Sequence, residues 1–76
     1  MKLAGIACYM RLTAAGVKAM DGLIEVGERG SFDALVEEED ERGLWVRARG
    51  NEEQRESVFF VKWEYIATIE ILGKSS

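Results

Sequence analysis

Residues 58–72 read VFFVKWEYIATIEIL and contain two apolar runs separated by a short polar stretch. The first run, Val58–Val61, is β-branched or aromatic at every position, which is typical of a strand covered on both faces. Trp63–Tyr65 breaks the alternation and predicts a tight single turn, after which Ile66–Leu72 predicts a fifth strand. We therefore expect Val58–Val61 to be the central strand. The residues expected to be least exposed are Phe60, Ile66, Ile69 and Val46.

Three further strands are predicted upstream of this stretch. Leu23–Val26, apolar except for Glu25, predicts one strand, and the glycines of Gly27–Gly30 allow the positive φ angles of a turn behind it. Alternating apolar side chains in residues 32–36 and 44–49 predict the second and third strands. The charged residues 39–43 form the turn between them.

Five short strands with tight connections predict a mainly β fold, a small, strongly bent antiparallel barrel that covers its own edges. The 76 residues allow one domain. We expect an N-terminal helical segment in residues 1–22, the barrel in residues 23–72, a polar loop at 51–56 and a flexible tail at 73–76.

The N-terminal segment carries two periodicities. A helix is favoured by its alanines and by the helical spacing of Leu3, Ile6, Ala7, Met10, Ala14, Val17 and Met20. Two interior glycines oppose a helix, and a strand is favoured by the alternation of Ile6, Cys8, Met10 and Leu12. We interpret the segment as a helix that packs on the barrel or on a neighbouring subunit.

Composition narrows the chemistry that the chain can perform. There is no His and one Cys, so no nucleophile and base can be paired, and Cys8 is expected to be a buried apolar residue. The acidic run Glu37–Glu41 could hold a hard cation, but it lacks a glycine-centred calcium loop and is better explained as a solvated hairpin end. We expect a non-enzymatic protein with no catalytic residue, no metal and no cofactor.

The net charge, the single Cys and the length of the apolar runs indicate which partners and which cellular location to expect. Ten basic and 14 acidic residues give a net charge of −4, which argues against a general polyanion-binding surface. A lone Cys is typical of a reducing compartment, and no apolar run is long enough to span a membrane. A cytoplasmic protein without membrane contact is the expectation.

One face of the predicted sheet could bind a ligand. Aromatic and basic side chains that share an exposed sheet face can stack bases or grip peptides. Alternatively, the tryptophans pack under the arginine stems and complete the core. The candidate residues for a nucleic acid or protein partner are Trp45, Arg47, Arg49, Lys62 and Trp63.

The order of elements, a helix and then five strands with a tight turn before the last, resembles the Sm-like small β-barrel family over residues 23–72. Residues 30–36 with Asp40 resemble the first Sm motif, with Ala34 where that family usually keeps Gly. Residues 61–66 resemble the second, with Trp63 where Gly is common. The family resemblance implies a ring-forming RNA binder. No clear Asn for base recognition follows the second strand.

Two functions of different classes follow. The first is a homo-oligomeric assembly or protein-interaction module, because so small a domain struggles to cover its apolar fourth and fifth strands alone. The second is an Sm-like protein that binds RNA or another single-stranded nucleic acid through the five candidate residues. The acidic net charge favours the first.

Overall fold

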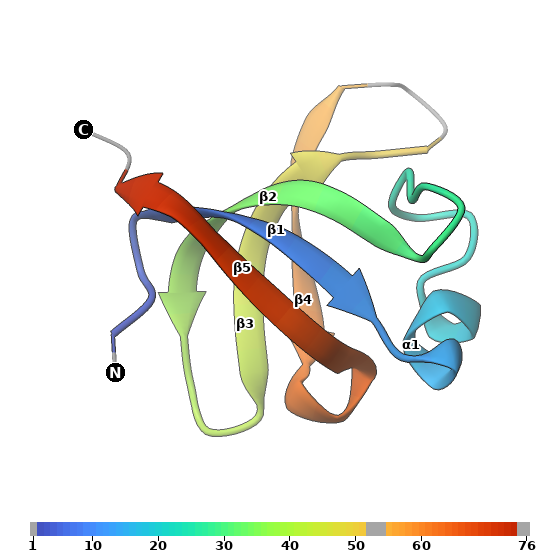
Figure 1. Ribbon diagram of the computed structural model, residues 1–76, viewed down its shortest axis with the longest axis horizontal. Coiled ribbons are helices and arrows are strands. Elements are labelled where there is room, and N and C mark those ends of the chain that lie inside the picture. Colours follow the sequence, from blue (N-terminus) through green and yellow to red (C-terminus); the bar gives the residue numbers. More distant parts are fainter. Residues whose placement is uncertain (1, 52–54, 75–76) are drawn as a thin grey trace.

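The computed structural model describes residues 2–51 and 55–74. The elements follow one another as β1 (Ile6–Leu12), α1 (Ala14–Ala19), β2 (Ser31–Glu39), β3 (Gly43–Arg49), β4 (Glu56–Lys62), the 3-10 turn η1 (Trp63–Tyr65) and β5 (Ile66–Lys74). The five strands form one antiparallel sheet in the order β4-β3-β2-β1-β5 (Figure 1). The prediction of a mainly β domain with five antiparallel strands is confirmed.

The sheet folds over on itself but does not close. In Figure 1, β1 and β5 lie in front of β3 and β4, and the core fills the space between them. The last strand pairs with β1, so β4 and β5 are the two ends of the strand order, without hydrogen bonds to each other in the described residues. The expectation of a barrel that covers its edges by closing is therefore wrong.

The N-terminal segment is a strand followed by a short helix, so the expected helix over residues 1–22 is wrong for most of its length. β1 lies between β2 and β5 and is hydrogen-bonded on both sides. This double pairing favours the strand over the helix, because the N–H and C=O groups on both edges of β1 then have hydrogen-bond partners. The alternating set is the buried one: Ile6, Cys8, Met10 and Leu12.

Leu23–Val26 is a loop and not the predicted strand. Within the described residues its only bridge joins Ile24 to Gly50. The Glu25 N–H donates to the Arg49 carbonyl at 2.9 Å, which fastens the segment across the end of β3. These backbone bonds hold Leu23–Val26 in place as a loop across the end of β3.

The predicted turns are confirmed. The Gly30 N–H donates to the Gly27 carbonyl at 3.0 Å, and Gly30 has a φ of 73°, which favours glycine. The β2–β3 hairpin turns at Asp40–Arg42 and η1 connects β4 to β5. Gly43 is required where the hairpin re-enters the sheet, because a Cβ there would collide with the Val61 carbonyl.

The burial pattern follows from the strand order. Val46 is fully buried, as predicted, but Phe60, Ile66 and Ile69 are only partly buried, so these three predictions are wrong. The reason is that Phe60 lies on β4, which was predicted to be central but is an edge strand, and that Ile66 and Ile69 lie on β5, the other edge. The most deeply buried side chains are Met10, Leu44, Val36, Val46, Val61 and Cys8.

The expected boundaries of the C-terminal tail and of the 51–56 loop each differ from the observed ones by one or two residues. Of the tail expected at 73–76, the first two residues extend β5, and 75–76 lie outside the described residues. The last residue of the loop expected at 51–56 begins β4, and 52–54 lie outside the described residues.

Candidate functional site

Three of the predicted site residues share one face of β3. Alternation along β3 turns Leu44 and Val46 into the core and leaves Trp45, Arg47 and Arg49 on the other face. Trp45 lies opposite Phe60 of β4, with ring centroids 4.9 Å apart and an angle of 49° between the ring planes. The indole is still 41% exposed.

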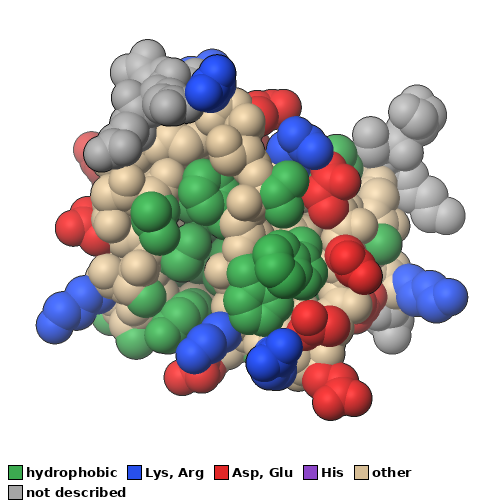
Figure 2. Space-filling model, turned by 180° about the vertical axis from the view of Figure 1, so that it is seen from behind, with side chains coloured by type: hydrophobic (Ala, Val, Ile, Leu, Met, Phe, Trp, Pro, Cys, Tyr) green, Lys and Arg blue, Asp and Glu red, His purple; other side chains and the backbone are tan. Residues whose placement is uncertain are grey.

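Hydrophobic side chains gather near the centre of this side of the molecule. Figure 2 shows them surrounded by basic and acidic side chains. The cross-strand register places the half-buried Leu35 beside Arg47, and the exposed Val58 on its other side. The face is thus a mixed apolar and charged surface and not a continuous basic one.

Both arginines of this face have acidic partners. The Arg47 Nε donates to Glu37 Oε2 at 2.8 Å, and this hydrogen bond and the Glu37 charge hold the pKa of Arg47 above its ordinary value. Arg49 Nε lies 4.0 Å from Glu25 Oε2. A phosphate would have to compete with these carboxylates for the guanidinium groups.

The remaining two candidates belong to other elements: Lys62 ends β4, two residues after Phe60, and Trp63 begins η1. The Lys62 Nζ is 5.9 Å from the ring centroid of Tyr65, close enough for a cation–π contact. The Trp63 Nε1 donates to the Asp40 carbonyl at 3.0 Å, and the Trp63 N–H donates to the Arg42 carbonyl at 3.0 Å. Trp63 therefore anchors η1 to the β2–β3 hairpin, so its indole is held by the fold.

The acidic run Glu37–Glu41 lies at the end of the β2–β3 hairpin, as predicted, and its side chains bind groups of the protein itself. Asp40 Oδ1 accepts N–H groups from Arg42 at 2.7 Å and Gly43 at 3.2 Å. The Arg42 N–H has the largest effect and lowers the pKa of Asp40; desolvation opposes it, and the Gly43 N–H and the Trp45 indole lower the pKa further. Glu39 accepts the Leu3 N–H at 2.6 Å and ties the N-terminal segment to β2.

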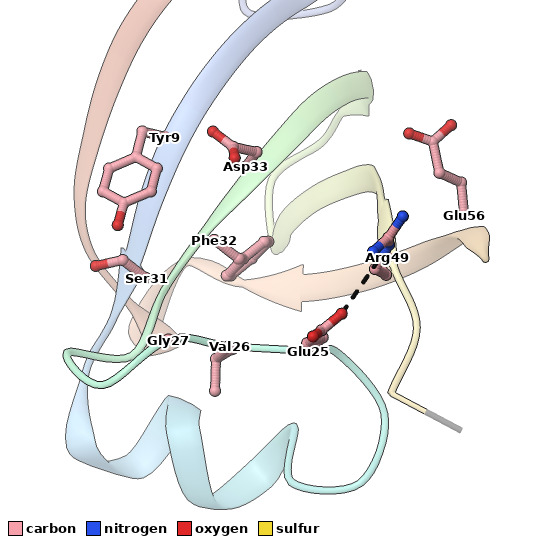
Figure 3. Close-up of a pocket in the computed structure, with 9 residues that line it drawn as sticks. All are labelled: Tyr9, Glu25, Val26, Gly27, Ser31, Phe32, Asp33, Arg49 and Glu56. Carbon is pink, nitrogen blue, oxygen red and sulfur yellow. Dashed lines mark ion pairs between the residues drawn. The ribbon is translucent and has the colours of Figure 1, made fainter. Parts of the chain in front are cut away.

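A pocket of about 480 Å³ lies beside the β3 face, and sequence reasoning missed all of its residues except Arg49. Figure 3 shows it between the outer faces of β1–β3 and the loop formed by residues 25–27. The lining residues are Tyr9, Glu25, Val26, Gly27, Ser31, Phe32, Asp33, Arg49 and Glu56.

Hydrogen bonds between backbone groups build this pocket. Tyr9 of β1 pairs with Asp33 of β2, and Arg49 of β3 pairs with Glu56 of β4, so one row of side chains crosses the sheet. The loop is held as a wall at both ends. Its first residue, Glu25, is bonded to Arg49, and its last donates an N–H to the Ser31 carbonyl at 2.8 Å.

The pocket is acidic and carries hydroxyl groups. Three carboxylates face a single guanidinium among the lining residues. Figure 3 shows the phenol end of Tyr9 directed toward Ser31. Tyr9 could have been found from the strand-like alternation of the N-terminal segment, which places it on the face opposite Cys8 and Met10; the helical interpretation concealed it.

Cys8 is buried, as predicted, with 1% of its surface exposed. Burial raises the pKa of its thiol, and the nearby charge of Asp33 adds to the effect. Both influences disfavour the thiolate, so Cys8 acts as a small apolar core residue.

In the part of the chain that the structure describes, no three or more acidic or Cys side chains are placed to hold a metal ion. No helix there is long and apolar enough to cross a membrane. Comparison with known proteins finds no matching family model, curated protein or solved structure. Fold and site therefore define the chain as a small antiparallel β domain with an open sheet and a loop-walled acidic pocket.

Proposed function

We propose that the protein is a non-enzymatic assembly module that self-associates through the two free edges of its sheet. The observation that carries this proposal is the exposure of apolar side chains on both edges. On β4, Val58 is 43% exposed; on β5, Ile71 is 47% and Leu72 is 56% exposed. An edge strand of this kind is a ready template for another chain.

The two edges suit each other as partners. An edge strand presents unpaired N–H and C=O groups, and β4 and β5 are 7 and 9 residues long. Pairing β4 of one copy with β5 of the next would leave no edge open within a closed ring. The observed order begins with a strand, β1, and not with the helix on which the resemblance to Sm-like proteins depends, so the two edges alone support the ring.

Charge placement on β4 supports pairing over its prevention, whereas β5 carries Glu70 in mid-strand. Natural edge strands are often protected by charged residues in mid-strand. On β4 the charged residues Glu56 and Lys62 stand at the two ends, while Val58–Val61 between them is apolar. The middle of the β4 edge is therefore left open to a partner strand.

RNA binding is the alternative. The half-exposed Trp45–Phe60 pair would offer a stacking surface. Against it stand the Glu partners of Arg47 and Arg49 and the net charge of −4. These features weaken the electrostatic contribution on which such binding depends.

Size-exclusion chromatography with light scattering at micromolar concentration tests self-association. We expect a mass that is a multiple of 8.5 kDa, and a monomer for Val58→Lys and Leu72→Lys, which place a charge on each edge. Tyr9→Lys is the matched control, since Tyr9 is 43% exposed but lies on β1, which is hydrogen-bonded to a neighbouring strand on each side. A monomeric wild type, or dissociation by the control alone, contradicts the proposal.

A further inference from the structure

We propose that the β4 edge pairs with β4 of a second copy of the chain, across a twofold axis, to give a dimer. This contact differs from the β4–β5 contact of the proposed ring and does not depend on it. The inference comes from the order of residues along β4, Glu56–Lys62, which is complementary to itself when it is read in the opposite direction.

β4 has one free edge in the part of the chain that the structure describes. Each of its 7 residues is paired with a residue of β3, from Glu56 opposite Arg49 to Lys62 opposite Gly43. No described strand lies on the other side, because β4 ends the strand order. An edge of this kind presents N–H and C=O groups that another strand can bind. Antiparallel pairing of two β4 strands is therefore open along the whole strand.

A twofold axis perpendicular to the sheet at Phe59 aligns the two strands over their full length. Twofold symmetry makes the pairing antiparallel and brings the same surface of both copies together. Glu56 of each copy then lies opposite Lys62 of the other, and Val58 lies opposite Phe60. Opposite charges and pairs of aromatic and β-branched side chains stabilise two strands when they face each other in this way. The order of residues along β4 thus supplies favourable pairs at both ends and in the middle.

The twofold arrangement also keeps both faces of the sheet continuous. Val61 belongs to the core, and the half-buried Phe59 packs against it. Val58 and Phe60 lie on the other face, where the ring of Phe60 contacts the ring of Trp45. Pairing would place the two Phe59 side chains side by side on the core face and would cover Val58, which is 43% exposed, with Phe60 of the second copy.

The charges at the ends of β4 select this register. A slip of two residues in one direction places Glu56 opposite Phe60, and a slip of two in the other direction places Lys62 opposite Val58. Either slip exchanges an attractive pair of charges for a charge facing an apolar side chain. A slip of one residue would place side chains of the core face opposite those of the outer face. The symmetric register therefore satisfies both the charges and the faces.

The other edge, β5, lacks this self-complementarity. A twofold axis at the centre of β5 would place Glu70 opposite Glu70 of the second copy, and like charges directly opposite each other destabilise a strand pair. The pairing of β5 with β1 is also irregular between Ile71 and Gly73, and such irregularities bend a strand. Of the two edges, β4 is the one that fits a second copy of itself.

Both end charges of β4 are available to a partner. Neither Glu56 nor Lys62 forms an ion pair with another residue in the described ranges. The Lys62 Nζ lies 5.9 Å from the ring centroid of Tyr65, close to the outer limit of a cation–π contact. Glu56 acts on Arg47 only through its charge, as the last of the influences that raise the pKa of Arg47. A second copy would therefore not have to break an ion pair to reach these groups.

Exchanging the charges at the two ends of β4 tests the twofold contact. The experiment uses the Leu72→Lys variant, in which a charge on β5 opposes the ring, and measures mass by sedimentation equilibrium from micromolar to millimolar concentration. One contact joins two copies in the dimer, whereas each copy in a closed ring has two, so we expect the dimer toward the upper end of this range. Its mass should approach twice 8.5 kDa.

In this background, Glu56→Lys and Lys62→Glu should each weaken dimerisation by about tenfold, because both end pairs become pairs of like charges. Glu56→Lys combined with Lys62→Glu restores opposite charges and should restore the dimer. An equimolar mixture of the two single variants should also dimerise, because opposite charges then meet at both ends. Glu28→Lys makes the same change of charge in the exposed turn before β2 and should leave the affinity unchanged.

The exchange distinguishes the twofold contact from every other one. In a β4–β5 contact the partner strand keeps its own charges, so neither the double variant nor the mixture would recover. Circular dichroism shows that each variant is folded. A double variant that dimerises no better than the single variants, or a monomer at every concentration in the Leu72→Lys background, would overturn the proposal. Failure of the proposed ring is detected separately, in the wild type at micromolar concentration.

Discussion

Asp40 shows how one side chain stabilises a connection between strands. Two N–H groups of the hairpin bind its carboxylate and lower its pKa, the Arg42 N–H most strongly. A carboxyl whose pKa is lower in the folded than in the unfolded chain stabilises the fold above its unfolded pKa. That contribution is lost as the pH falls through the folded-state pKa.

We therefore expect Asp40→Asn to flatten the acid end of the stability profile. The amide keeps an acceptor oxygen but cannot lose its contribution by protonation. Thermal melts of both proteins between about pH 6 and pH 2 check this, with the wild type losing more stability below about pH 4 than the variant. Parallel curves would mean that the hairpin N–H groups do not favour the ionised carboxyl.

β1 contributes four buried side chains to the core, and single residues can test its weight there against that of β4. Met10 is fully buried, so Met10→Ala should lower the free energy of unfolding by about 2–5 kcal/mol. Phe60 is partly exposed on the edge strand β4, and Phe60→Ala should cost less, mainly its contact with the Trp45 ring. Urea unfolding of both variants measures the difference. A larger loss for Phe60→Ala would place the centre of the core in β4.

At the scale of elements, α1 depends on a close contact with η1. The Thr13 Oγ1 accepts the Gly16 N–H at 3.0 Å and so caps the helix, and the Thr13 N–H donates to the Tyr65 carbonyl at 2.8 Å. Gly16 is buried, and a Cβ there would collide with the Tyr65 carbonyl and lie 2.9 Å from its Cβ. The glycine that opposes a helix by propensity is needed for the helix to pack.

Gly16→Ala should therefore destabilise the protein by about 1–3 kcal/mol, although alanine is the better helix former in isolation. Gly27→Ala is the control, because a Cβ there meets its nearest atom at 3.5 Å, an ordinary contact. We expect the control to change stability by less than about 0.5 kcal/mol. Thermal melts compare the two. Stabilisation by Gly16→Ala would show that α1 does not approach η1 so closely.

The edges of the sheet are also set at the scale of elements. β5 returns to pair with β1, and this leaves β4 with β3 as its only neighbour among the described residues. The same aromatic and β-branched residues that predicted a central strand thus lie at an edge, where Phe59 and Phe60 are half-buried. Under the proposed self-association, a partner strand would provide the cover that the residue types suggest.

For the whole molecule, sequence patterns predicted the features that depend on neighbouring residues, namely the faces of the strands and the turns. Alternation placed Trp45, Arg47 and Arg49 on one face of β3, and the glycines and charged runs marked the turns at Gly27–Gly30 and Asp40–Arg42. The tight turn at Trp63–Tyr65 was also predicted from its break in alternation. Each of these features depends on residues only a few positions apart.

The candidate site was predicted only in part. The β3 face was found, but the glutamates that pair with its arginines, and the use of Trp63 as an anchor, come from other elements. The pocket was missed because Tyr9 comes from β1 and Glu25 from a loop that only the fold brings against Ser31 and Asp33. Contacts between segments far apart in the chain leave no periodic signal.

The sequence by itself determined that this is a small, mainly β chain, where four of its strands lie, and where its turns fall. Only the tertiary structure decided that residues 6–12 are a strand and that 23–26 are not, and which strands are edges. The physical reason is that the N-terminal residues satisfy both a helical and an alternating pattern. Their pairing with β2 and β5, whose backbone groups need partners, selects the strand.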